Sequence, residues 1–216
     1  MGAADSMTAP WYNRFAGQSV ERMAALSDGI FAVAMTLLVL DLHVPAREGV
    51  HTEGQLCAAL AAMAPQLVSY LMSFLTLAIF WNGQQVQMNH FKRGDRNLAW
   101  IHVVFLAAVS MMPFSTRLLA EFIGFKLALL SYWANVLVLE VVLYTSWWYA
   151  KKAGLLKDDT TPEAGKAIER RIVVAQILYA FGAALCVVND YASIAFIVAV
   201  QLNFAIAPRI RWLNRF

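Results

Sequence analysis

Charged residues are scarce in this sequence. They make up 14% of its 216 residues, whereas hydrophobic residues make up 60%. Typical soluble domains contain about 25% charged and about 45–50% apolar residues. This balance excludes a disordered chain and most soluble enzymes, and it indicates a membrane protein with several spanning segments. The formal net charge of +3 is too small to indicate a nucleic-acid partner.

Residues for covalent, redox or metal chemistry are also few. The two cysteines, Cys57 and Cys186, are far apart and show neither CxxC nor CxxH spacing, so they predict no disulfide framework and no metal site. The four histidines share no ligand spacing, and GxSxG, HExxH and P-loop motifs are absent. Glu140 is the ionisable residue deepest in an apolar segment, and it stands alone. We therefore expect neither an enzyme nor a resident cofactor or metal.

Six apolar segments approach or exceed the roughly 20 residues that a membrane-spanning helix needs. They are residues 27–44, 58–84, 98–119, 125–149, 172–188 and 191–207. Only Asn189 and Asp190 separate the last two, which predicts a tight helical hairpin. The sequence therefore predicts an all-α membrane protein with six transmembrane helices in residues 22–216, preceded by an N-terminal cytoplasmic tail in residues 1–21.

Lysine and arginine are distributed unevenly between the two ends of these segments. Fourteen of the seventeen fall on one side, and the other side holds only Arg47, Arg117 and Lys126. Loops rich in Lys and Arg stay in the cytoplasm. This asymmetry predicts a multi-pass protein of the lipid bilayer with both termini in the cytoplasm.

The first span carries polar groups only near its ends. Between Gly29 and Leu40 every residue but Thr36 is apolar or glycine. Ser27 or Asp28 at its start is consistent with a cap on the helix N-terminus, and also with a polar group that faces protein. Arg22 lies six residues before Asp28, which does not place the two on one helix face. They pair only if the chain bends or another helix joins them.

An apolar seam runs along the same span. Leu26, Ile30, Val33, Leu37, Leu40 and Val44 follow one another at spacings of 4, 3, 4, 3 and 4 residues. In a helix that is apolar all round, such a seam is equally consistent with simple packing against neighbours. Thr36 borders the seam, and the default role of its hydroxyl is a hydrogen bond to a carbonyl one turn earlier.

The stretch RMAALSDG at 22–29, followed by IFAVAMTLLVLDLHVP, resembles a known signature. It is similar to the R-x-x-x-F-S-D motif that opens each repeat of the lysosomal potassium channel family, called transmembrane protein 175 in animals. LMSFLTLAIFWNGQQ at 71–85 is similar to the second helix of that family, with Trp81 at its usual place. FLAAVSMMPFSTRLL at 105–119 is similar to the third. The chain resembles a bacterial member with one six-helix repeat, where the animal proteins have two.

The resemblance implies a potassium-selective cation channel in a bacterial inner membrane. It implies a homotetramer in which the first helix of each subunit lines a central pore for K⁺. The family's ring of branched apolar side chains that forms the constriction falls at Val33, with further apolar rings at Leu37 and Leu40. The pore-facing threonine of the family falls at Thr36. These rings would act as a hydrophobic gate.

The resemblance also implies a polar network that holds the pore helix. Its members would be Arg22, Ser27, Asp28 and Trp81. Outside the resemblance, Asp41 stands at the expected outer mouth of the pore, where it would concentrate cations; an ordinary solvated loop acid is an equal alternative.

The sequence departs from the family pattern at several positions. Leu26 replaces the signature phenylalanine, and Val33 stands where isoleucine is common. Family members tend to carry histidine shortly after Trp81, but Asn-Gly-Gln-Gln follows here at 82–85. This argues against pH control at the site and leaves Gln84 or Gln85 as a neutral hydrogen-bond partner.

Other functions remain open at this point. A secondary transporter is one alternative, but the chain shows no broken-helix pair or inverted repeat. A weakly selective cation or proton leak pathway and a non-conducting membrane scaffold are the others.

Overall fold

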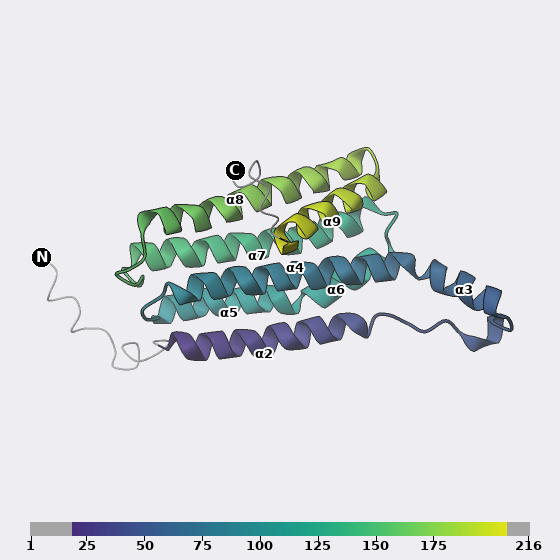
Figure 1. Ribbon diagram of the computed structural model, residues 1–216, viewed down its shortest axis with the longest axis horizontal. Coiled ribbons are helices and arrows are strands. Elements are labelled where there is room, and N and C mark those ends of the chain that lie inside the picture. Colours follow the sequence, from purple (N-terminus) through teal and green to yellow (C-terminus); the bar gives the residue numbers. More distant parts are fainter. Residues whose placement is uncertain (1–18, 207–216) are drawn as a thin grey trace, which may run out of the picture.

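The computed structural model describes residues 19–206, and this part of the chain is helical with no β-strand (Figure 1). The long elements are α2 (Val20–Val39), α4 (Ala64–Asn89), α5 (Arg96–Ser110), α6 (Met112–Glu121), α7 (Lys126–Lys152), α8 (Pro162–Ala184) and α9 (Asp190–Ile206). The short ones are α3 (Glu53–Ala62) and the 3-10 turns η2 (Arg47–Gly49) and η3 (Leu185–Val187). The all-helical expectation is confirmed over these residues.

Five helical segments are long and apolar enough to cross a membrane. They are α2, α4, the pair α5 and α6, α7, and α8 with η3. The sixth expected span, α9, is apolar but has only 17 residues. The break between α5 and α6 falls at Met111, because Pro113 in the first turn of α6 lacks an N–H and its ring crowds the preceding turn. The chain is thus a multi-pass membrane protein.

The structure corrects the expected boundaries of the first two spans. The first helix runs over 20–39 rather than 27–44, because the Ser19 side chain caps it and accepts a hydrogen bond from the Arg22 N–H over 3.2 Å. Ser27 and Asp28 therefore lie inside the helix, and the interpretation of either as its cap is wrong. The expected span 58–84 is divided into α3 and α4 near Met63, where Pro65 begins a new helix.

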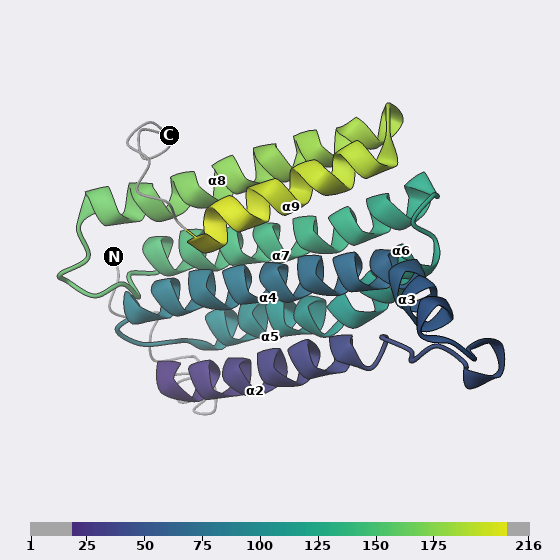
Figure 2. The same ribbon diagram turned by 45° about the vertical axis from the view of Figure 1, so that its right-hand side comes forward.

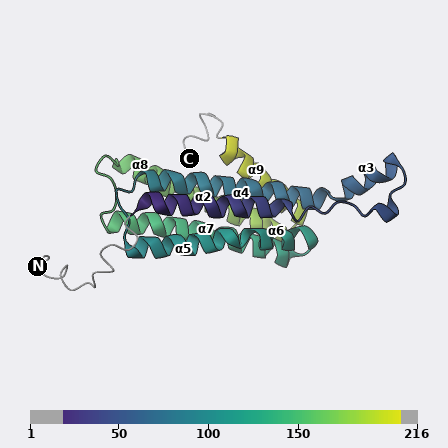
Figure 3. The same cartoon turned by 90° about the horizontal axis from the view of Figure 1, so that it is seen from below.

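The long helices lie side by side along one direction, with α2 and α8 at opposite edges of the bundle (Figures 1 and 2). Helix α2 packs mainly on α4, α5 and α6, while α9 fills the space between α4 and α8. Helix α3 extends beyond one end of the bundle (Figure 3), and none of its side chains is buried. Because α2 has neighbours on one side only, its other side is left bare.

The basic residues separate between the two ends of the bundle. The end where α2, α5 and α8 begin holds Arg22 and the segments 92–96, 151–157 and 166–171. The opposite end holds Arg47, Arg117 and Lys126. The remaining basic residues that entered the orientation argument, Arg14, Arg209, Arg211 and Arg215, lie outside the described residues, as does most of the expected N-terminal tail.

Candidate functional site

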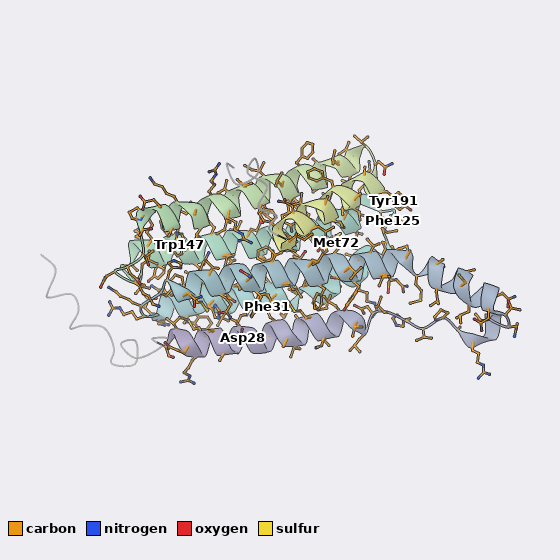
Figure 4. All side chains as sticks on the ribbon, in the orientation of Figure 1. Asp28, Phe31, Met72, Phe125, Trp147 and Tyr191 are labelled. Carbon is orange, nitrogen blue, oxygen red and sulfur yellow. The ribbon has the colours of Figure 1, made fainter. Side chains whose placement is uncertain are left out.

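Helix α2 buries one narrow stripe of side chains. Its members, Met23, Ser27, Phe31, Ala34 and Leu38, recur every three or four residues and form one face of the helix. Phe31 packs against Phe105 of α5, with the ring centroids 6.0 Å apart, and Leu38 is fully buried. Figure 4 labels Phe31 together with Asp28 on this helix. The buried stripe determines which face of α2 points away from the subunit.

The residues expected at the constriction lie on that outward side. Val33, Leu37 and Leu40 have exposed fractions of 55%, 43% and 69% in the single subunit. Thr36 is also exposed, and its hydroxyl donates to the Val33 carbonyl over 2.8 Å. The hydroxyl therefore has its default backbone partner, while the oxygen keeps lone pairs free. An apolar stripe of this kind is suited either to lipid or to a surface shared between copies.

Asp28 joins α2 to α4. Its Oδ1 atom accepts one hydrogen bond from Trp81 Nε1 over 2.8 Å and another from Gln85 Nε2 over 2.9 Å. The two donors are four residues apart and so share one face of α4. The structure thus places Asp28 and Trp81 together, with Gln85 as the neutral partner.

Arg22 does not join this group. Its side chain is exposed, and no ion pair between Arg22 and Asp28 occurs within residues 19–206. The reason is geometric: α2 is a continuous helix from Val20, so residues six apart point in different directions. The bend that would have brought them together is absent from the described chain.

Ser27 forms a second polar contact with a residue that the sequence reasoning missed. Its Oγ atom lies 2.9 Å from His102 Nε2 and donates to the Met23 carbonyl over 3.0 Å. His102 Nε2 is also 3.0 Å from the Met23 carbonyl, and Nδ1 is 3.0 Å from Gln84 Nε2. A ring that carries its proton on Nε2 and accepts at Nδ1 satisfies all these contacts.

His102 was overlooked because the histidines were searched for metal-ligand spacing. The available signal was a histidine inside an apolar span, since such residues almost always face protein. Gln84, an expected partner of Arg22 or Asp28, instead binds this ring. The contacts of Asp28 and Ser27 with α4 and α5 together form the polar anchor of α2. This anchor contains a titratable group, His102, although none stands directly after Trp81 in sequence.

Asp41 lies just beyond the C-terminal end of α2. Its carboxylate is 4.0 Å from Arg117 Nη1 of α6, and Arg117 Nε donates to Glu121 over 2.9 Å. The side chain of Asp41 is partly exposed. It is therefore neither a free loop acid nor an unopposed negative charge within its own subunit.

Comparison with known proteins finds ion channels of one family. The family model described as "Endosomal/lysosomal potassium channel TMEM175" matches residues 22–113. A potassium channel of Streptomyces collinus is 30% identical over 78% of this chain and 82% of its own length. The mouse endosomal/lysosomal proton channel TMEM175 is 32% identical over 48% of this chain and 22% of its own length.

A solved structure is similar as well. The crystal structure of a lysosomal potassium-selective channel TMEM175 homologue from Chamaesiphon minutus matches with a TM-score of 0.77 and 26% identity. The match covers 88% of this chain and 98% of that one. The similarity therefore extends over nearly the whole helical bundle.

Proposed function

This chain belongs to the TMEM175 family, a family of ion channels and not of enzymes, and from that premise we propose that it is a potassium-selective cation channel. The supporting observation in the structure is the outward face of α2. It presents an apolar stripe with one exposed hydroxyl, while its opposite face is fixed to the subunit by packing and by two polar contacts.

A single subunit cannot enclose a pore with one helix, so conduction requires symmetric copies. Closed rotational symmetry places the same face of every copy at the axis. Helix α2 stands at the edge of the bundle with one side bare, as a helix next to such an axis must. We therefore propose a homotetramer whose central pore is lined by four α2 helices.

In this assembly Val33, Leu37 and Leu40 form successive apolar rings. Narrow apolar rings exclude water and so close the pore to ions, as in hydrophobic gates. Four Thr36 oxygens lie beside these rings, and each donates its own proton to the backbone. The lone pairs of these oxygens can therefore coordinate K⁺ and replace part of its hydration shell.

The polar contacts set the position of the pore helix. Asp28 is held by α4, and Ser27 is held through His102 of α5. Asp41 stands at the outer mouth beside Arg117, so its attraction for cations is reduced but not cancelled at 4.0 Å. Arg22 forms no ion pair with Asp28 in the described part of the chain, so the network as proposed holds α2 without it.

We place the protein in a bacterial inner membrane with both termini in the cytoplasm, on the separation of basic residues between the bundle ends. Residues 22–216 form the six-helix unit, with α9 as the sixth span. At 17 residues α9 is about 25 Å long, somewhat less than the bilayer core of about 30 Å. Local thinning of the bilayer accommodates the difference.

Reconstitution of the purified protein in a planar bilayer tests this function. We expect unitary current steps and a bi-ionic K⁺/Na⁺ reversal potential that favours K⁺. Flux without unitary steps would instead support a transporter, and no flux would support a scaffold. Because one relative is named a proton channel, a pH gradient without K⁺ should also be applied. A reversal potential that follows the proton gradient would favour the leak pathway.

A further inference from the structure

A cavity of about 70 Å³ lies in the part of the subunit away from α2. It is enclosed by α4, α7, α8 and the last turn of α9, near the point where α9 ends partway along α8 (Figure 1). Its walls are mostly apolar and include Phe80, Leu143, Ile172 and Phe204. The cavity is on the opposite side of α4 from Trp81, because the lining residues Gly83 and Gln87 are two and six positions further along the helix.

Two polar groups without partners border this apolar space. Glu140 of α7 is 4% exposed, and its Oε2 atom has no hydrogen-bond partner within the described chain. Tyr179 of α8 is 2% exposed, and its hydroxyl is likewise unpartnered among the described residues. Buried polar groups are nearly always hydrogen-bonded, and ionisable residues at membrane depth mark functional sites.

The missing partner must donate hydrogen bonds, and among such donors a cation also stabilises the ionised form of Glu140. A carboxyl group in an apolar pocket repels anions, whereas an ammonium group beside it forms a pair with no net charge and with strong hydrogen bonds. The phenol oxygen of Tyr179 accepts a further N–H. The 70 Å³ is the space open to the centres of water molecules, and about 10–15 Å³ of such space holds one water molecule, so an ammonium head and part of an alkyl body fit.

Arg171 also borders the cavity, and its positive charge repels a cation, whereas ionised Glu140 attracts one. Its side chain is exposed, and its guanidinium lies 5.7 Å from the centre of the Phe204 ring. This stacking fixes the guanidinium against one ring that lines the cavity. The other apolar walls, among them Phe80, Leu143 and Ile172, are suited to an alkyl or aryl body.

We propose that this cavity binds a primary ammonium ion with an apolar body, whose head pairs with Glu140 and Tyr179. The site is distinct from the pore and is contained within one subunit. Its ligand class is a small lipophilic amine, and neutral or anionic analogues of the same shape bind more weakly because they form no ion pair with Glu140.

The test uses n-hexylammonium chloride and 1-hexanol as matched probes. Each is titrated calorimetrically into the full-length protein in lipid nanodiscs, with empty nanodiscs subtracted for partitioning. We expect saturable binding of hexylammonium, with 1-hexanol at least about ten-fold weaker. Glu140→Gln keeps the shape of the side chain and should weaken hexylammonium about ten-fold or more. Glu53→Gln, at an exposed acid of α3, should leave it unchanged.

Two results would overturn the proposal. Wild-type affinity in Glu140→Gln would place the amine elsewhere, for example in the pore, and no saturable binding at all would mean that the cavity holds only water. If Glu140→Gln does not fold, Gly83→Leu provides the second variant. The Cβ position of Gly83 is 3.7 Å from Leu143, so a larger side chain enters the cavity. That variant should abolish binding, and unchanged binding would refute the site.

Discussion

Leu37 and Leu38 are adjacent in sequence, but one is exposed on α2 and the other is buried, and this pair tests the pore assignment most sharply. Leu37 is 43% exposed in the subunit, and Leu38 is fully buried. Leu38→Ala should therefore lower the free energy of unfolding by about 2–5 kcal/mol, the usual range for a buried leucine. Leu37→Ala should cost only about 1–2 kcal/mol, since the removed carbons are already half out of the core.

The effects on conduction should be the reverse. Leu37→Ala removes three carbons from each of four subunits at one level of the pore, so the ring widens and wets. Unitary conductance should rise and the K⁺/Na⁺ permeability ratio should fall, while Leu38→Ala should leave the ratio unchanged in whatever channel assembles. Thermal unfolding and bi-ionic reversal potentials measure the two quantities separately. A changed ratio in Leu38→Ala together with a wild-type ratio in Leu37→Ala would refute the assigned face.

Cysteine substitution provides a direct check on the same face. In a background without Cys57 and Cys186, a small water-soluble thiol reagent should block current from cysteine at position 37. Val39 is the control, because it is also exposed in the subunit but points about 160° away from position 37 around the axis of α2. Equal block from both positions would show that the wrong face has been assigned to the pore.

The remaining predictions concern assembly and the polar contacts. Native mass spectrometry in mild detergent should show a tetramer, and a monomer that conducts would contradict the pore of four α2 helices. Asp28→Ala removes the acceptor of both α4 donors, and because these contacts are exposed in the single subunit it should lower the free energy of unfolding by about 0.5–1.5 kcal/mol per hydrogen bond; it should also abolish current. Arg22→Ala should destabilise an isolated subunit less, because no ion pair with Asp28 is lost; equal losses in thermal unfolding would show that the two side chains act together. His102→Ala removes the hydrogen-bond partner of Gln84 and should lower the free energy of unfolding by about 1–3 kcal/mol. An unchanged free energy of unfolding would show that His102 does not stabilise the subunit.

The helical class and the order of the spans could be predicted from hydropathy, because each span is a local property of about 20 residues. The start of α2 could not, since it depends on the side chain of Ser19 rather than on apolar composition. The anchor was only half predictable. The signature pointed to Asp28 and Trp81, but Ser27 meets His102 across 75 residues of sequence, a contact that no local pattern encodes.

The two hydrogen bonds to Asp28 have a mechanical consequence. A twist of α2 about its own axis by one residue, about 100°, would carry the carboxylate away from both donors on α4 at once. A sideways tilt of α2 together with α4 and α5 stretches neither bond, because the three helices then move as one rigid body. A tilt that widened the proposed pore in this way would keep both hydrogen bonds of Asp28, whereas a rotation of α2 about its own axis would break them.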